Sequence, residues 1–352
     1  MMKIDKTKPV LVTGATGYVA GWLVKLLLEK GITVHAAVRD PDNKNKIDHL
    51  LQLAKKTKGK LKFFKTDLLE EDSYTKAMKG CELVYHTASP FTSKIKDPEK
   101  DLLNPAKLGT RNVLQSANLV KSVKRVVVTS SCAAIYGDNI DLQSTPGNIY
   151  TEEIWNTSSS LHHQAYSYSK VMAEKEAWSI QQQQKRWDLV VINPSLVIGP
   201  ALNLDSITSE SFNILKQFGD GSIKPGVPNL GIGVVDVRDL AFAHFQAGFL
   251  AKASGRHIVS GYNTSLLEMA KALVPSFGEE YPLPRRELPK WIIWLVGPLL
   301  NKNLTREFIQ KNVGYPFIAD NSKSIEQLKV TYRPLQESME DTFRQMIDAG
   351  VF

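Results

Sequence analysis

The strand, turn and helix predicted for residues 9–30 constrain the fold more than any other part of the chain. Val10, Leu11 and Val12 form a short apolar run that is typical of a buried strand. The turn that follows has glycine at positions 14 and 17 and alanine at position 20, and an apolar helical pattern continues from it. A helix that starts directly after such a turn offers unpaired backbone N–H groups and the positive end of its dipole to an anion. The Gly-x-x-Gly-x-x-Ala spacing after a strand therefore predicts a site for a dinucleotide pyrophosphate.

Strand and helix patterns then alternate along the chain, which is typical of a parallel sheet covered by helices on both faces. We expect strands at 32–38, 61–65, 82–86, 125–129 and 190–194, and helices at 47–58, 101–120 and 166–184. The predicted fold is α/β, a Rossmann-type doubly wound parallel sheet with a smaller C-terminal substrate-binding lobe.

The change of pattern after residue 200 predicts two domains. We assign residues 1–200 to the dinucleotide-binding domain, and residues 201–352 mainly to the substrate-binding lobe. Residues 231–260 are expected to return to the main sheet. Residues 137–163 are predicted to form a long loop, and loops of this length inside compact domains are usually functional.

Composition excludes several classes of function. The chain carries 44 Lys and Arg against 36 Asp and Glu, a net charge of +8, but it has no dense basic block with interleaved aromatic residues, so we expect no nucleic-acid partner. The two cysteines, Cys81 and Cys132, have no metal-binding spacing, and we expect a reducing, cytoplasmic setting and no metal. The N-terminus lacks the apolar segment of a signal peptide.

The most apolar late stretch is residues 291–300. It is shorter than the roughly 20 residues that span a bilayer, so we predict no membrane span. We interpret the stretch as a core helix or as a lid over an apolar pocket, in preference to an interfacial anchor.

Charged residues after the second predicted strand indicate which dinucleotide binds. Arg39 follows this strand directly, and Lys44 and Lys46 lie shortly behind it. In folds of this kind the position meets the adenosine ribose, where a cation pairs with the 2′-phosphate of NADP and an acidic residue binds the 2′-hydroxyl of NAD. We therefore predict NADP(H) as the cofactor. NAD is the alternative, because Asp40 could bind its 2′-hydroxyl.

Two further polar residues have structural interpretations. Asp67, at the end of the third predicted strand, either accepts a hydrogen bond from the adenine amine or caps the next helix. Asn112, in the helix 101–120, is expected to bind the backbone of a neighbouring loop.

A tyrosine, a lysine and a serine predict the chemistry. Tyr166 and Lys170 are four residues apart in a predicted helix, so both lie on one helical face. An ammonium group one turn away favours the phenolate form of a tyrosine, which suits acid–base work at neutral pH. A serine at the end of strand 125–129 is placed to hold a substrate oxygen. With a nicotinamide cofactor carrying the hydride, the expected reaction interconverts a carbonyl and an alcohol.

These motifs resemble those of the extended short-chain dehydrogenase/reductases. The residues that carry the resemblance are 13–20, 86–90, 129–131, 166–170 with 173–175, and 193–195 with 198–200. Residues 38–41, 49–51 and 79–81 resemble the dihydroflavonol 4-reductase and cinnamoyl-CoA reductase branch in particular. The resemblance weakens after about Tyr281. It implies NADPH as cofactor, with Arg39 and Lys46 on the 2′-phosphate, and a catalytic serine at Ser131, with Ser130 as the neighbouring alternative.

The resemblance also implies the remaining site residues. The cofactor would meet Gly14, Thr16, Gly17, Tyr18, Val19, Arg39, Lys46, Asp67, Leu68, Thr87, Ala88, Lys170, Pro194 and Val197. The substrate pocket would be lined by Ser89, Phe91, Cys132, Tyr136 and His163, for which simple packing is the competing interpretation. At the position that resembles the substrate-orienting Asn of the flavonoid reductases, this chain has Tyr136. The difference argues against a flavonoid substrate.

Four functions compete. The preferred one is an NADPH-dependent reductase of aldehydes or ketones that acts on an aromatic or bulky apolar substrate. The alternatives are a hydroxysteroid-type dehydrogenase, a nucleotide-sugar epimerase that retains NAD, and a non-catalytic NADP-binding protein. Arg39 argues against the epimerase, and the intact set of Ser131, Tyr166 and Lys170 argues against the binding protein. We expect a small-molecule carbonyl or alcohol as substrate, and a monomer or homodimer.

Overall fold

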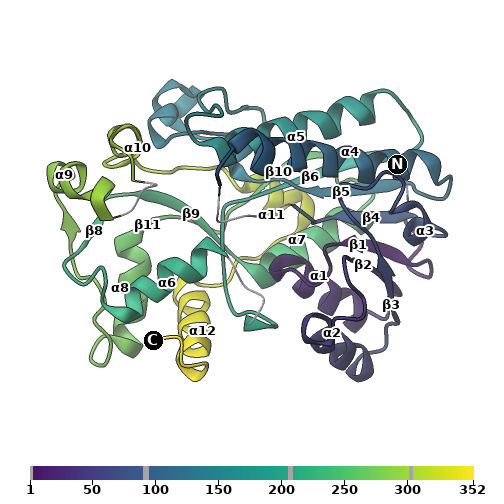
Figure 1. Ribbon diagram of the computed structural model, residues 1–352, viewed down its shortest axis with the longest axis horizontal. Helices are drawn as coiled ribbons and strands as arrows, with labels where there is room; N and C mark the ends of the chain where they lie inside the picture. Colours follow the sequence, from purple (N-terminus) through teal and green to yellow (C-terminus); the bar gives the residue numbers. More distant parts are fainter. Residues whose placement is uncertain (1–2, 90–94, 205–208, 301–303) are drawn as a thin grey trace.

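The main feature of the computed structural model is a seven-stranded sheet. The structure describes residues 3–89, 95–204, 209–300 and 304–352. The strand order is β10-β6-β5-β4-β1-β2-β3, and every neighbouring pair runs parallel (Figure 1). The sheet is made of β1 (Val10–Thr13), β2 (Val34–Val38), β3 (Leu61–Lys65), β4 (Leu83–His86), β5 (Arg125–Thr129), β6 (Asp188–Pro194) and β10 (Gly255–Val259). The predicted doubly wound Rossmann-type fold is confirmed, and β1 and β4 flank the point where the strand order reverses.

Helices bury both faces of this sheet, because successive side chains of each strand point to opposite sides. Val10 and Val12 pack in one core while Leu11 packs in the other. In Figure 1 the first face is covered by α1 and α7 and the second by α4 and α5, on the other side of the sheet. The helices of the first face are α1 (Tyr18–Glu29), α2 (Lys44–Lys56), α7 (Val237–Phe249) and α11 (Ser322–Leu328); those of the second are α3 (Thr75–Met78), α4 (Asn104–Leu119), which continues η1 (Glu99–Leu103), and α5 (Ala165–Gln182).

A second lobe surrounds two small sheets and has an apolar core of its own. β6 leads almost directly into β7, so the chain passes from the main sheet into this lobe at residue 195. The strands are β7 (Leu196–Ile198), β9 (Gly231–Asp236) and β11 (Tyr262–Ser265) in one sheet, and β8 (Val227–Pro228) and β12 (Glu287–Leu288) in the other. The helices are α6 (Glu210–Asp220), α8 (Leu266–Phe277), α9 (Lys290–Leu300), α10 (Arg306–Asn312) and α12 (Leu335–Asp348).

Two segments for which the sequence predicted particular roles are the loop 137–163 and the apolar stretch 291–300. The loop carries two short 3₁₀ turns, η3 (Asn139–Ser144) and η4 (Pro146–Asn148). The apolar stretch forms α9, but only Ile293 and Gly297 are buried, so the interpretation as a core helix is wrong. Apolar composition predicted the helix, whereas its burial depended on neighbours that the sequence does not specify. None of the helices in the described ranges combines the length and the apolar character that crossing a membrane requires.

Three buried histidines are held in the neutral form. His244 of α7 lies with Nδ1 2.8 Å from Leu240 O and Nε2 2.7 Å from Thr129 Oγ1, so the ring donates to the carbonyl and accepts from the hydroxyl. Burial lowers the pKa of His244 to about 4. Burial and the nearby Lys323 lower the pKa of His257 to about 4. Burial and Lys170 lower the pKa of His86 to about 3.

These histidines predict acid sensitivity of the fold. Between pH 6.5 and about 4 the unfolded chain binds protons at these positions and the folded chain does not, so stability falls as pH falls. Each histidine contributes at most about 1.4 kcal/mol per pH unit to this slope. Replacing His244→Gln is expected to flatten the dependence of the free energy of unfolding on pH, measured by urea titration at several pH values. His162→Gln, at an exposed site, is the matched control. Equal slopes for wild type and His244→Gln would contradict the prediction.

Candidate active site

The turn after β1 forms an anion cradle against the end of β4. Gly14 has a φ of +61°, and a Cβ there would lie 3.0 Å from both Cα and Cβ of Ala88, so only glycine fits without displacement. Thr13 fixes the approach, because its hydroxyl accepts a hydrogen bond from Ala88 N at 3.0 Å. Gly17 caps α1 without a side chain, and the first turn of α1 contains no acidic residue. The first amides of α1 are therefore left for an anion, and this geometry fits a dinucleotide pyrophosphate.

Tyr18 links α1 to the second lobe. Its hydroxyl donates to Gly199 O at 2.5 Å, and its ring meets Phe212 edge-on with centroids 5.4 Å apart. Trp22, one turn later, donates from Nε1 to Pro200 O at 2.8 Å. The Tyr18 side chain therefore joins α1 to the second lobe, a role that sequence reasoning did not assign.

Exposed cations lie where the adenosine end of a dinucleotide would lie in this fold. Arg39 follows β2 and is exposed, and Lys44 and Lys46 occupy the first turn of α2, which contains no acidic residue. Asp40 is turned into its own loop, where it accepts a hydrogen bond from Asp42 N at 3.0 Å. Arg39, Lys44 and Lys46 are therefore the cations that fit a 2′-phosphate here.

The loop after β3 is held by α4. Asp67 accepts from Leu69 N at 2.9 Å, so its carboxylate stabilises the turn after β3. The next helix, α3, begins at Thr75 with Tyr74 as its N-cap, so the interpretation of Asp67 as a helix cap is wrong. Asn112 donates from Nδ2 to Leu68 O at 2.8 Å, which confirms the prediction that it binds loop backbone. A Cβ on Gly109 would lie 3.2 Å from Leu68, so the helix and the loop are in close contact.

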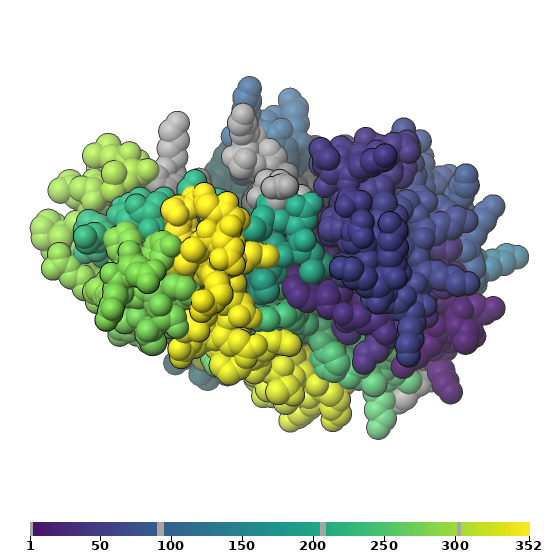
Figure 2. Space-filling model, turned by 90° about the horizontal axis from the view of Figure 1, so that it is seen from below, coloured from purple at the N-terminus to yellow at the C-terminus, as the bar shows by residue number. Residues whose placement is uncertain are grey.

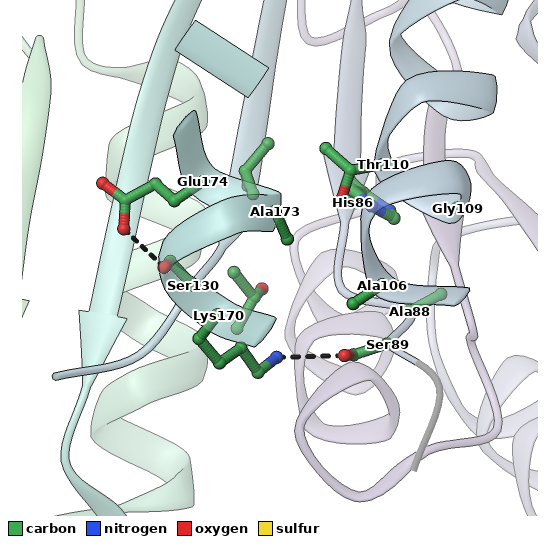
Figure 3. A pocket seen from close by; sticks show the side chains of 12 residues that line it. His86, Ala88, Ser89, Ala106, Gly109, Thr110, Ser130, Lys170, Ala173 and Glu174 are labelled. Atoms are coloured by element: carbon green, nitrogen blue, oxygen red, sulfur yellow. Dashed lines mark hydrogen bonds between the residues drawn. The ribbon is translucent and has the colours of Figure 1, made fainter. Parts of the chain in front are cut away.

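The tyrosine and the lysine come together at the start of α5. Tyr166 lies in the first turn and is 43% exposed, whereas Lys170 is buried at 8% exposure. Lys170 Nζ lies 5.6 Å from the centroid of the Tyr166 ring. It also donates to Ser89 Oγ at 3.0 Å, as Figure 3 shows. An ammonium group has three N–H donors, so others remain for the hydroxyls of a ribose or for the tyrosine oxygen.

The two serines after β5 have different partners. Ser130 is buried and its hydroxyl donates to Glu174 Oε2 at 2.5 Å, as Figure 3 shows. Ser131 is half-buried and its oxygen accepts from Ala133 N at 3.1 Å, as the N-cap of η2 (Cys132–Ala134). The hydroxyl hydrogen of Ser131 is therefore available to a ligand, whereas the hydroxyl of Ser130 is occupied within the protein.

Glu174 is a residue that sequence reasoning missed. It is 1% exposed, and its carboxylate accepts from Ser130, from Asn193 Nδ2 at 2.8 Å, from Arg256 Nε at 2.6 Å and from Trp178 Nε1 at 3.3 Å. A cavity of about 20 Å³ between α4, α5 and the ends of β4 and β5 lies beside Glu174 and Lys170. Glu174 could have been found from the sequence because it lies four residues after Lys170, on the same face of the helix.

The end of β6 carries two buried polar atoms whose partners the described ranges do not supply. They are Asn193 Oδ1 and Ser195 Oγ, and they flank Pro194. Pro194, the last residue of β6, and Val197, in β7, are the cofactor contacts that the resemblance implies at this edge of the sheet.

The residues expected to line the substrate pocket have different surroundings. Ser89 holds Lys170, and Phe91 lies outside the described residues. Cys132 is 4% exposed and donates from Sγ to Asn193 O at 3.2 Å. Tyr136 stacks on Tyr150 with centroids 4.8 Å apart, in the same apolar cluster as Cys132. The side chains of Cys132 and Tyr136 therefore pack beneath the site, which is the competing interpretation stated for them.

His163 is the remaining pocket residue. Its Nε2 lies 2.6 Å from Asp138 Oδ2, and its Nδ1 lies 3.6 Å from Glu307 Oε2 on α10. It thus stands between the loop that leads into α5 and the second lobe.

Comparison with known proteins agrees with this geometry. The sequence pattern of the NAD dependent epimerase/dehydratase family matches residues 10–253. A cinnamoyl-CoA reductase of Medicago truncatula is 40% identical over 275 residues, which cover 76% of this chain and 81% of the relative. An anthocyanidin reductase of Arabidopsis thaliana is 39% identical over 281 residues, covering 77% of this chain and 81% of the relative.

A solved structure extends the likeness to almost the whole chain. The yeast methylglyoxal/isovaleraldehyde reductase Gre2, crystallised with NADPH, matches with a TM-score of 0.79 and 27% identity, covering 98% of this chain and 100% of that chain. The chain therefore belongs to the NAD-dependent epimerase/dehydratase family, in the reductase branch of the extended short-chain dehydrogenase/reductases.

Proposed function

We propose that this oxidoreductase is an NADPH-dependent carbonyl reductase, which converts an aldehyde or ketone reversibly to an alcohol. The observation that carries the proposal is the grouping of Tyr166, Lys170 and a serine with an available hydroxyl beside the bare N-terminus of α1. The cofactor, when bound, supplies the hydride. The protein then has to deliver one proton to the carbonyl oxygen and to stabilise the charge that develops there.

Each side chain has one task in this mechanism. Ser131 donates a hydrogen bond to the carbonyl oxygen and orients it. Tyr166, which is exposed at the start of α5, gives its phenolic proton to the same oxygen. Lys170 stabilises the resulting phenolate from one helical turn away, and Ser89 holds its ammonium group in place. In the direction of oxidation the same residues act in reverse.

The choice of NADPH rests on charge. Arg39 and the acid-free first turn of α2 favour a 2′-phosphate over the 2′-hydroxyl of NAD. This also argues against an epimerase, which retains NAD and uses the same Tyr and Lys. The yeast relative with its NADPH supports the same choice.

We further propose an aromatic or bulky apolar substrate. The relatives named for cinnamoyl-CoA and anthocyanidin are consistent with aromatic substrates, although they differ from each other. We also propose that residues 1–200 form the cofactor domain and residues 201–352 mainly the substrate-binding lobe. Of residues 231–260, which were expected to return to the main sheet, α7 and β10 do so, whereas β9 belongs to the small sheet of β7 and β11. The two cysteines are free, which fits a reducing, cytoplasmic setting.

The first prediction concerns the proton donor. Tyr166→Phe is expected to lower kcat by about 10²- to 10⁴-fold in NADPH oxidation assays over a panel of aromatic aldehydes, dicarbonyls, hydroxycinnamoyl thioesters and ketosteroids, because it removes the proposed proton donor. Binding of NADPH, measured by fluorescence, should change little. Tyr168→Phe, two residues away on another face of α5, is the control. Turnover retained by Tyr166→Phe would refute the catalytic assignment.

The second prediction separates the two serines. Ser131→Ala is expected to lower kcat by about 10²-fold, because it removes one hydrogen-bond donor to the reacting oxygen. It should also lower the free energy of unfolding by about 0.5–1 kcal/mol, because it removes the N-cap of the short turn η2. Ser130→Ala should lower the free energy of unfolding more, by about 1–3 kcal/mol, because Glu174 loses a buried partner. If Ser130→Ala gave the larger loss of kcat at unchanged stability, the roles would be exchanged.

The third prediction concerns cofactor choice. Arg39→Ala is expected to raise KM for NADPH by about 10- to 100-fold, the value of a charge-assisted hydrogen bond, and to leave KM for NADH nearly unchanged. Lys56→Ala, at the opposite end of α2 and also exposed, is the matched control. An equal effect on both cofactors would contradict the assignment of the 2′-phosphate to Arg39.

A further inference from the structure

Helix α9 presents a concentrated apolar surface that the proposed reaction does not use. Its exposed side chains are Trp291 (68% exposed), Trp294 (42%), Leu295 (56%), Leu299 (85%) and Leu300 (82%). The other large apolar side chains that the described ranges leave exposed are scattered over the rest of the protein. Contiguous apolar surface of this kind usually marks an interaction site.

Four of these five exposed residues form one stripe along the helix. Trp291, Trp294, Leu295 and Leu299 follow the i, i+3, i+4, i+8 spacing of a single helical face. The buried residues Ile293 and Gly297 lie on the opposite face, and Ile293 packs in a small apolar cluster with Ile309 of α10. The helix is therefore anchored on one side, and its more apolar side is exposed apart from the contact of Trp294 with the Arg306 guanidinium.

The amino-acid sequence on either side of this stripe is rich in basic residues. Residues 285–306 contain five basic residues, Arg285, Arg286, Lys290, Lys302 and Arg306, and a single acidic one, Glu287. The Arg306 guanidinium lies 4.4 Å from the ring of Trp294, on the stripe itself. Glu307, the next acidic residue, is paired with Lys311 at 2.7 Å.

This combination matches the chemistry of an anionic lipid surface. Tryptophan rings and leucines enter the boundary between headgroups and acyl chains, while arginine and lysine stay at the level of the headgroup phosphates. Juxtaposed basic residues contribute to binding in proportion to the negative charge of the membrane. A helix of this length, about 16 Å, is too short to span the bilayer but long enough to lie in its surface.

The position of α9 favours a membrane over a second copy of the chain. α9 and α10 lie at the far end of the second lobe, opposite β3 and α2 (Figure 1), and the yellow-green end of the molecule is again at one extremity in Figure 2. A stable interface between two copies buries about 800 Å² on each partner. A single helix of about three turns at an extremity offers less, whereas it can enter a lipid surface without a complementary shape.

We propose that α9 is an interfacial helix that docks the protein on anionic membrane surfaces through Trp291, Trp294, Leu295 and Leu299, with Arg306 on the headgroups. This function is independent of the proposed reductase activity. It takes up the interfacial anchor that the sequence left as the less favoured alternative for residues 291–300.

The test is sedimentation of the full-length protein with lipid vesicles. The protein is expected to bind vesicles of phosphatidylcholine with phosphatidylserine at least tenfold more tightly than vesicles of phosphatidylcholine alone, and high salt should weaken this binding. Arg306→Gln should weaken it about fivefold, the equivalent of about 1 kcal/mol per basic residue. The double variant Leu295→Gln, Leu299→Gln should abolish it.

The control is Leu119→Gln, which changes a 59% exposed leucine on α4 and should leave vesicle binding intact. Circular dichroism and gel filtration verify that each variant is folded. Absence of binding of the wild-type protein to anionic vesicles would overturn the proposal, as would equal binding by the Leu295, Leu299 variant. A wild-type dimer that the same variant converts to a monomer, without vesicle binding, would show that a second copy covers the stripe instead.

Discussion

The site depends on one buried carboxylate. Glu174 belongs to α5, and its partners come from the end of β5 (Ser130), from β6 (Asn193) and from β10 (Arg256). An isolated carboxylate in the interior costs several kcal/mol, and that cost is offset only when all of these donors are in place. The donors surround the carboxylate together only when α5 has one particular position along the three strands. Because Tyr166 and Lys170 precede Glu174 on the same helix, the buried carboxylate sets the position of the residues proposed for the chemistry.

A second buried carboxylate fixes the beginning of the same helix. Asp138 has no exposed surface, and it accepts from Asn312 Nδ2 at 2.6 Å, from Gln164 Nε2 at 3.3 Å and pairs with His163. Gln164, which precedes α5, has the left-handed φ of 56°. The long segment 137–163 is therefore ordered by polar contacts to α10 of the second lobe. Tyr166 follows Gln164, a member of this polar cluster, by two residues. Both lobes therefore contribute to the position of Tyr166.

The sequence predicted what depends on local pattern. The strand at 125–129 and the helix around Tyr166 to Lys170 follow from β-branched runs and from periodicity, and both agree with the structure. It did not predict contacts between distant residues: Arg256 is 82 residues from Glu174, and Asn312 is 174 from Asp138. The same limit explains α9, because an apolar helix can be predicted from its own residues but the neighbours that bury or expose it cannot.

The cofactor cradle and the second lobe share a rigid element. The amides at the start of α1 face the predicted pyrophosphate, and the side chains of Tyr18 and Trp22 in the same helix bind the carbonyls of Gly199 and Pro200. These carbonyls lie just after β7, where the chain has entered the second lobe. A ligand that binds the first turn of α1 therefore also stabilises the helix that holds Gly199 and Pro200, at the start of the second lobe. In this arrangement the halves proposed to bind cofactor and substrate are aligned by α1 on one side of the sheet and by α5 on the other.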